Sequence, residues 1–330
     1  MKATTQSHIS NDFWKRTIVL LKAILVIGMV VLLYYQIFNR DNINDLSRAF
    51  TSSLSWSNGW LLALTILLLP ANWLLESFKW KTIVSSFSDT SLKESMKVIL
   101  GGLSFGILTP SRIGEYGGRF YMTEDEDRWK TISATFVGSL SQNIITAILG
   151  LAGASYLLYY SQVMTSFIAT SIWYVASIAI ILGLLFYYNI GFIQHIVRFL
   201  PGKWAKICDA HSNFLSQLNP STLNKILLLS FFRYLIYALQ YILMLHFFGI
   251  SVHFAEAGAA VSLIFLIQSG LPFPPVLDVL ARGEIALTIW ALYSENALGI
   301  LACTFSIWII NLIIPALIGL IYVIMKDTSS

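Results

Sequence analysis

Long apolar runs alternate with short polar segments along most of the chain. Runs of about 20 apolar residues, the length that crosses roughly 30 Å of hydrocarbon, predict membrane-spanning helices. The runs lie at about residues 17–38, 59–78, 132–160, 166–188, 226–248 and 297–325. The first run is longer than the apolar core of a signal peptide, so it is expected to stay as a span. The pattern predicts an all-α polytopic membrane protein with about seven transmembrane helices.

Two apolar regions, residues 101–122 and 257–292, are interrupted by glycine, proline and charge. Glycine and proline break regular helix, and broken backbone at membrane depth is tolerated only where it is buried in protein or lines a wet cavity. Each region is therefore predicted to be a re-entrant hairpin of two half-helices. The residues expected to form the breaks or hinges are Pro110, Gly114, Pro272, Pro274, Pro275 and Gly283.

The lysines and arginines of the loops predict sidedness. The loop after residue 78 is lysine-rich, with Lys79 among its lysines, whereas residues 161–165 and 249–256 contain no lysine or arginine. By the positive-inside rule both chain ends are cytoplasmic, provided that each broken region returns to its own side. The broken regions then enter from opposite faces, as in an inverted repeat. We predict a single domain, residues 1–330, with repeats at about residues 59–160 and 226–325.

Charged residues accompany the first break. Arg112 and Arg119 offer guanidinium groups, whose planar fork suits a lipid phosphate. Glu115 is suited to holding an arginine in place or to contacting a cationic headgroup. An internal salt bridge in a cytoplasmic turn is the alternative. Ionisable residues at membrane depth mark functional sites, so all three are predicted to bind substrate.

Arg282 and Glu284 are predicted to do the same work at the second break. Pairing of Arg282 with Asp278 is an alternative, purely structural role. We expect Arg282 and Glu284 to lie close to the Arg112 and Glu115 pair across a shared cavity near the membrane midplane.

Two further ionisable residues lie alone in apolar runs. Arg233 is predicted to line the substrate cavity, although a snorkelling role is also open. Glu76 lies close to the predicted end of its run, which favours snorkelling toward the membrane surface. Whether Glu76 is structural or functional is open from the sequence.

Composition supports a membrane class, with 56% hydrophobic and 12% charged residues. A soluble domain carries about 25% charged residues. The net charge of +4 lies mainly in loops, as in a cytoplasmic membrane face rather than a nucleic-acid surface. Cys208 and Cys303 indicate neither a disulfide nor a metal site. No histidine pair has zinc-ligand spacing, and the acidic run at residues 124–127 is interpreted as a solvated face. We expect no metal, no cofactor, no catalytic residue and no nucleic-acid partner.

The segment Thr109-Pro110-Ser111-Arg112-Ile113-Gly114-Glu115, followed by Arg119, resembles the first signature of the lysylphosphatidylglycerol synthase transmembrane-region family, the flippase-like domains. Pro272 through Glu284 and Ala286 fall where that family has a proline- and glycine-rich turn ending in Arg-Glu. The second turn departs from the family pattern, because Pro274-Pro275-Val276-Leu277-Asp278 replaces its glycine cluster. The resemblance implies a lipid-translocating domain. Because the chain ends at Ser330, no aminoacyl-transferase domain is expected after it.

The sequence thus predicts a flippase that moves a polar lipid or lipid-linked molecule between leaflets of a bacterial inner membrane. The expected partners are a phospholipid or glycolipid and a lipid-modifying enzyme. No ATP-binding motif occurs, so movement is expected to be downhill, ion-coupled or driven by a partner. Two alternatives are open: a membrane enzyme with Glu115 or Glu284 as its acid–base group, and a membrane scaffold or regulator.

Overall fold

The protein is described from a computed structural model, in residues 58–124, 126–161, 166–192, 213–271 and 275–328. The first half contains α3 (Gly59–Val84), α4 (Leu92–Gly106), α5 (Gly114–Met122), α6 (Arg128–Ser161) and α7 (Ser166–Tyr188). The second half contains α10 (Pro220–Phe247), α11 (Phe254–Gly270), α12 (Pro275–Trp290), α13 (Ala297–Trp308) and α14 (Ile314–Thr328). No strand occurs in the described ranges, which confirms the all-α prediction.

Four helical segments of the described chain are long and apolar enough to cross a membrane: α3, residues 128–159 of α6, α10, and the continuous run from α13 into α14. Residues 173–188 of α7 and all of α11 are shorter apolar helices. These helices fit a polytopic membrane protein. The predicted first span, residues 17–38, lies outside the described residues.

Helix boundaries differ from the predicted runs where a polar residue is paired or a cap is present. α3 continues past Phe78 to Val84, because the lysine that follows Phe78 is buried in an ion pair. α10 begins at Pro220, where the side chain of Asn219 accepts a hydrogen bond from the backbone N–H of Thr222. Proline is tolerated at the first helical position, because the backbone N–H that it lacks would have no partner within the helix there.

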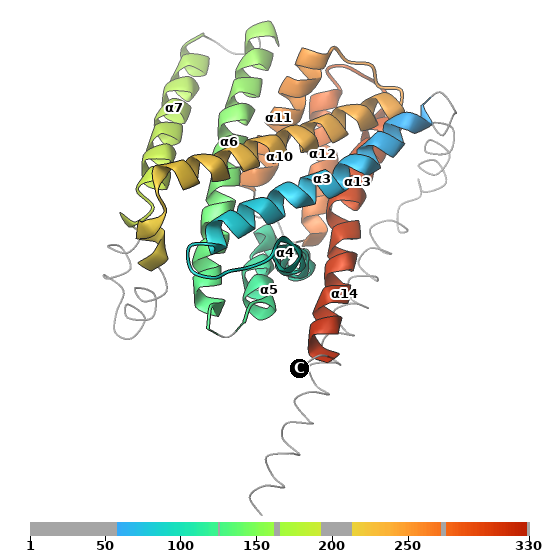
Figure 1. Cartoon of the computed structure of the whole chain (residues 1–330). Helices are drawn as coiled ribbons and strands as arrows, with labels where there is room; N and C mark the ends of the chain where they lie inside the picture. The colour runs from blue at the N-terminus through green and yellow to red at the C-terminus, as the bar shows by residue number, and fades with distance from the viewer. Residues whose placement is uncertain (1–57, 125, 162–165, 193–212, 272–274, 329–330) are drawn as a thin grey trace, which may run out of the picture. The chain divides into compact units, whose positions relative to one another are not determined.

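α3 and α10 lie side by side and cross obliquely in front of the more upright helices α6, α11 and α14 in Figure 1. Apolar residues of α3, α4, α6 and α10 form a buried core that includes Ile83, Leu103, Val137 and Ile226. α3 and α10 also pack against each other over much of their length.

Each broken region contains two successive helices that pack against each other. The first pairs α4 with α5 across a short 3₁₀ helix, Pro110–Arg112, and the second pairs α11 with α12. Of the predicted break residues, Pro272 and Pro274 lie outside the described residues, while Pro275 is the first residue of α12. Whether the hairpins are re-entrant and related by an inverted repeat stays a prediction.

The first hairpin is fastened to α14. The hydroxyl of Ser104 in α4 donates a hydrogen bond to the carbonyl of Ala316 in α14 at 2.8 Å. Gly319 lies so close to the backbone of Leu100 that a Cβ there would overlap its carbonyl. At the end of α14, Lys326 Nζ donates to the Tyr121 carbonyl at 2.8 Å. These contacts place the hairpin firmly beside the C-terminal helix.

Candidate functional site

The break in the first hairpin is built from Thr109 to Gly114. Ser111 and Arg112 have positive φ values of 49° and 57°, a backbone conformation that residues other than glycine rarely adopt. The Thr109 hydroxyl accepts a hydrogen bond from the Gly114 N–H at 2.6 Å, which ties the two sides of the break together. Such strain at a polar turn is typical of functional sites, where the surrounding contacts impose it.

Glycines let α5 lie directly against α4. A Cβ at Gly118 would be 2.8 Å from the Cα of Gly102, and a Cβ at Gly102 would be 2.5 Å from Cγ of Arg119. A Cβ at Gly106 would overlap Cγ of Glu115. The glycines therefore leave room for the Arg119 and Glu115 side chains beside α4, and the Arg119 side chain reaches Glu76 of α3.

Glu76 of α3 is the centre of a buried ionic cluster. Its Oε2 lies 2.7 Å from Lys79 Nζ and 3.0 Å from Nη1 of Arg233, and its Oε1 lies 3.4 Å from Nη2 of Arg119. The Glu76 side chain is only 5% exposed. Three helices, α3, α5 and α10, thus meet through one carboxylate.

The cluster extends along α5 toward the surface. Nη2 of Arg119 also lies 3.2 Å from Oε2 of Glu115, so this one nitrogen is shared by two carboxylates. Oε1 of Glu115 lies 3.9 Å from Nη1 of Arg112, whose side chain is 39% exposed. Arg112 is therefore the exposed end of the cluster, and Glu76 is its buried end.

Amides continue the cluster into the C-terminal helices. Nε of Arg233 donates to Oδ1 of Asn72 at 2.9 Å, and the Asn72 amide donates to Oδ1 of Asn311 at 3.3 Å. Asn311 lies within a π-helical segment, Ile309–Ile313, that joins α13 to α14. π-helical insertions in α-helices often accompany functional sites.

Aromatic rings line the cluster. The guanidinium carbon of Arg119 lies 5.0 Å from the Trp80 ring centre, and that of Arg233 lies 5.3 Å from the Trp73 ring centre. Such cation–π contacts stabilise a desolvated arginine. Two buried donors, Nε of Arg119 and Nε1 of Trp73, have no hydrogen-bond partner among the described residues.

The cluster carries more positive than negative charge. Its cations are Lys79, Arg112, Arg119 and Arg233, and its carboxylates are Glu76 and Glu115. Buried charge is costly unless it is paired. An excess of cations together with two unused N–H donors suits an additional anion.

The structure brings some of the predicted site residues together. Arg112, Glu115, Arg119 and Arg233 share the cluster. The predicted snorkelling of Glu76 is wrong, because three cations hold its carboxylate inside the protein.

The second hairpin has its own polar contacts. Arg282 donates from Nε to Asp278 and from Nη1 to Gln268, both at 2.9 Å, which is the structural pairing considered as an alternative. Within the described residues, no hydrogen bond or ion pair joins Arg282 or Glu284 to Arg112 or Glu115. Their approach across a shared cavity stays a prediction, as does the binding role of Arg282 and Glu284.

Gly283, the predicted hinge of the second hairpin, lies inside α12. A Cβ at this position would be 3.2 Å from Cδ2 of Leu301 in α13. It therefore serves close packing of α12 against α13, and a hinge role stays a prediction.

The cluster has the composition of an ion-pair network rather than of a metal centre. Among the described residues, no group of three or more histidine, cysteine or acidic side chains is placed to hold a metal ion. The arrangement offers buried cationic hydrogen-bond donors, a chemistry suited to phosphate or carboxylate.

The signature around Arg112 lies within a region that a protein-family model matches. The sequence model described as lysylphosphatidylglycerol synthase TM region matches residues 19–319. The chain belongs to this family. A comparison with curated proteins finds no match. As a member of the lysylphosphatidylglycerol synthase transmembrane-region family, the chain is a membrane domain compatible with a flippase-like role.

Sequence reasoning missed Lys79 and Asn72 as members of the site. The lysine-rich stretch predicts a cytoplasmic loop at Lys79, whereas the structure places this residue in α3 with 2% of its side chain exposed. Its Nζ donates to the carbonyl of Gly138 in α6 at 3.3 Å. One signal was available: Asn72, Glu76 and Lys79 follow the i, i+4, i+7 spacing of a single helix face.

Proposed function

We propose that this membrane domain moves a polar lipid or lipid-linked molecule between the leaflets of a bacterial inner membrane. The observation that carries the proposal is the buried ionic cluster with its excess of cations, in a chain of the lysylphosphatidylglycerol synthase transmembrane-region family. A charged headgroup crosses hydrocarbon at great cost, and cationic donors at membrane depth lower that cost.

In this mechanism the headgroup first meets Arg112, the exposed end of the cluster. The headgroup then replaces the carboxylates of Glu76 and Glu115 as the partner of Arg119. When no headgroup is bound, Glu76 and Glu115 neutralise part of the positive charge, and the remaining excess of cations favours binding of an anionic headgroup. The acyl chains stay in the surrounding lipid, and relative movement of the two hairpins exposes the site to each leaflet in turn.

The test is lipid movement in vesicles that contain the purified full chain. Vesicles carry fluorescent phosphatidylglycerol, phosphatidylcholine or a glycolipid, and a membrane-impermeant reductant bleaches only the outer leaflet. The proposal expects bleaching of inner-leaflet label for at least one of these lipids, and none in protein-free vesicles. No movement of any labelled lipid contradicts it. A new lipid product detected by mass spectrometry, without movement, favours the membrane enzyme instead.

A further inference from the structure

The π-helical segment Ile309–Ile313 interrupts the long C-terminal helix between α13 and α14. The N–H of Ile314 donates to the carbonyl of Ile309, five residues back, where a regular α-helix would bond four residues back. Pro315 follows directly and has no backbone N–H, so it cannot return the chain to the regular pattern at that residue. A π-helical insertion and a proline are usual causes of a bend in a helix, and here they occur together.

The π-helical segment joins two helices that pack against different hairpins. Before it, α13 packs against α12 of the second hairpin, where Gly283 lies close to Leu301. After it, α14 packs against α4 of the first hairpin, where the Ser104 hydroxyl donates to the Ala316 carbonyl at 2.8 Å. A change of angle at the π-helical segment would therefore move one hairpin relative to the other.

A chain of buried amides connects this segment to the ionic cluster. Nε of Arg233 donates to Oδ1 of Asn72 at 2.9 Å, and the Asn72 amide donates to Oδ1 of Asn311 at 3.3 Å. The Asn311 amide in turn donates to the carbonyl of Ile307 in α13 at 3.4 Å. Asn72 is fully buried and Asn311 is 3% exposed, so neither amide is open to water. Displacement of the Arg233 side chain therefore alters hydrogen bonds that reach the π-helical segment.

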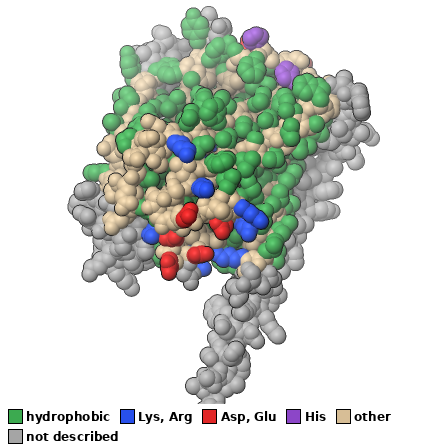
Figure 2. Space-filling model, viewed as in Figure 1, with side chains coloured by type: hydrophobic (Ala, Val, Ile, Leu, Met, Phe, Trp, Pro, Cys, Tyr) green, Lys and Arg blue, Asp and Glu red, His purple; other side chains and the backbone are tan. Residues whose placement is uncertain are grey.

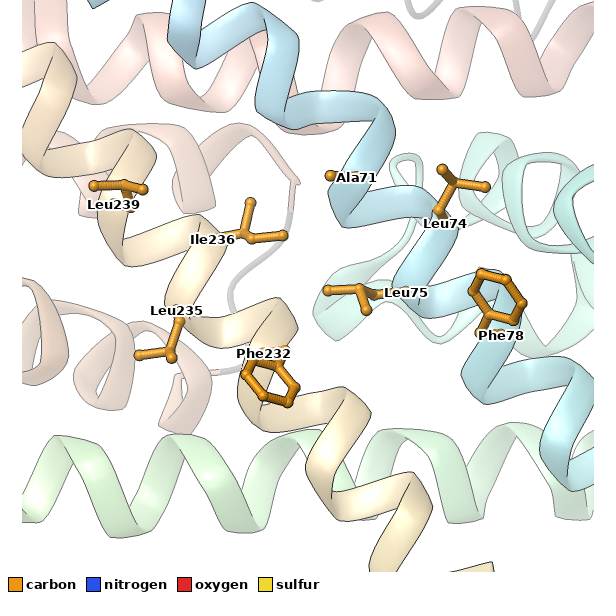
Figure 3. Close-up of a pocket in the computed structure, with 8 residues that line it drawn as sticks. All are labelled: Ala71, Leu74, Leu75, Phe78, Phe232, Leu235, Ile236 and Leu239. Atoms are coloured by element: carbon orange, nitrogen blue, oxygen red, sulfur yellow. The ribbon is translucent and has the colours of Figure 1, made fainter.

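The polar contacts of α3 and α10 point into the protein. Figure 2 shows charged side chains gathered near α4 and α5 on a face that is otherwise largely hydrophobic. Figure 3 shows that α3 and α10 present apolar side chains, such as Leu75 and Ile236, on a different face from Asn72 and Arg233. The amide chain is thus an internal connection from the charged region to the C-terminal helices.

We propose that Ile309–Ile313 is the hinge between the two hairpins, and that Asn72 and Asn311 are positioning residues that couple this hinge to Arg233. An anionic headgroup in the cluster competes with Glu76 for Arg233, and movement of this guanidinium alters its hydrogen bond to Asn72. The hydrogen bond to Asn311 shifts in turn, and the hinge changes its angle. Such coupling requires that the headgroup binds one hinge conformation better than the other. The inference rests on the proposed function, for which it supplies the moving part.

The experiment measures the distance between the hairpins by pulsed electron paramagnetic resonance on the full chain in vesicles. Lys93→Cys in α4 and Thr288→Cys in α12, both at exposed positions, carry spin labels in a cysteine-free background. The vesicles contain phosphatidylcholine alone or equal parts of phosphatidylcholine and phosphatidylglycerol. Coupling between two sites is commonly about fivefold or more, so phosphatidylglycerol is expected to change the ratio of shorter to longer distances by about fivefold or more.

Asn311→Leu removes the amide chain at the hinge. The matched control is Gln240→Leu, which removes a fully buried amide that joins α10 to α3 outside the chain, where Nε2 donates to the Thr65 carbonyl at 2.9 Å. Asn311→Leu is expected to reduce the effect of phosphatidylglycerol to less than about twofold, whereas Gln240→Leu keeps it at about fivefold or more.

Pro315→Ala tests the hinge without removing a hydrogen bond, and it guards against misfolding of Asn311→Leu. The substitution restores a backbone donor and favours a continuous helix. We expect this variant to be at least as stable as the wild type, to lose the effect of phosphatidylglycerol on the distances, and to move lipid about fivefold more slowly. A merely structural role of Pro315 would leave the distances and the rate unchanged.

The outcomes separate the hinge from the proposed function. Equal distance distributions in the two kinds of vesicle overturn the hinge, and lipid movement in the same vesicles then leaves the proposed function standing. A change of distance without lipid movement supports the hinge and contradicts the proposed function. Loss of the effect in folded Gln240→Leu, or its persistence in Pro315→Ala, also overturns the inference. If Asn311→Leu does not fold, Pro315→Ala decides between the two results.

Discussion

The carboxylate of Glu76 links three helices, α3, α5 and α10. Its carboxylate contacts Lys79, Arg119 and Arg233, and these come from three different helices. Truncating one partner of a buried charge pair is costly, because the remaining charges lose their compensation in a medium that solvates them poorly. Stability and function are therefore both expected to depend on this one side chain.

Replacing Glu76 by glutamine is expected to destabilise the protein by about 3 kcal/mol or more, since it leaves buried cations unpaired. The matched control is Asp127→Asn, which breaks an ion pair with Lys130 whose side chains are 18% and 31% exposed. Pairs near the surface contribute at most about 1 kcal/mol. Thermal unfolding in detergent measures both variants. Equal, small shifts in the two would contradict the compensating role of Glu76.

A capping box formed by Ser91 and Glu94 closes the N-terminus of α4, outside the four helical segments long enough to cross a membrane. The Ser91 hydroxyl accepts from the Glu94 N–H, and the Glu94 carboxylate accepts from the Ser91 N–H at 2.8 Å. The backbone hydrogen bond from Ser91 lowers the pKa of Glu94 below its ordinary value. This contribution is present above the ordinary carboxylate pKa and is lost as pH falls through the lowered folded-state value.

Glu94→Gln keeps an acceptor at this position and removes its titration. We expect the variant to lose the acid-dependent part of helix protection at α4, as measured by hydrogen exchange of the Ser91 and Glu94 amides across the acid range. The cap itself is tested by Ser91→Ala, with an expected loss of about 1 kcal/mol. An unchanged pH profile in Glu94→Gln would show that the carboxylate does not cap the helix.

At the scale of elements, close contact between α4 and α5 positions the arginine-bearing face. Gly118 is buried against the backbone of Gly102, whereas Gly117, the preceding residue, has open space where a Cβ would be. Alanine substitution at Gly117 changes helix propensity alone, whereas alanine substitution at Gly118 also introduces a steric overlap with α4. Alanine favours a helix over glycine by about 1 kcal/mol, while overpacking costs about 1–3 kcal/mol.

Gly118→Ala is therefore expected to destabilise the hairpin and to displace Arg119 from Glu76, and Gly117→Ala is expected to be neutral or slightly stabilising. Unfolding temperature and the rate of lipid movement are measured for both. If Gly118→Ala is as stable and as active as Gly117→Ala, the tight apposition of the two helices is not what positions Arg119.

The break between α4 and α5 was predictable from sequence because glycine, proline and charge at residues 101–122 each act locally on the backbone. The cluster was only partly predictable. Arg112, Glu115 and Arg119 lie near one another along the chain, whereas the approach of Arg233 to Glu76 depends on packing of α3 against α10. Lys79 was misplaced because a charge at the end of an apolar run normally marks a water-exposed loop, and its burial depends on a partner from the same helix.

At the scale of the whole molecule, the predicted topology has both hairpins returning to their own sides. Single cysteines at Ser86 and Asn213, in a cysteine-free background, are expected to react with an impermeant reagent from the cytoplasmic side. Cysteines at Ser53 and Thr165 are expected to react from the outside. Labelling of the Ser86 and Thr165 positions from the same side would contradict the re-entrant assignment.

A role for the cationic cluster in binding a lipid headgroup predicts that lipid movement depends on Arg112. Its nearest carboxylate contact is a long 3.9 Å, and its side chain is 39% exposed, so Arg112→Gln removes a cation with little effect on packing. A charge-assisted hydrogen bond contributes about 1.5–3 kcal/mol, which corresponds to a loss in rate of about tenfold or more.

The decisive measurement is the rate at which phosphatidylglycerol crosses the bilayer of vesicles that contain either the wild-type chain or Arg112→Gln. We predict a loss of about tenfold or more for the variant, with an unchanged unfolding temperature. An unchanged rate in the folded variant would contradict a role for the cationic cluster in moving the headgroup.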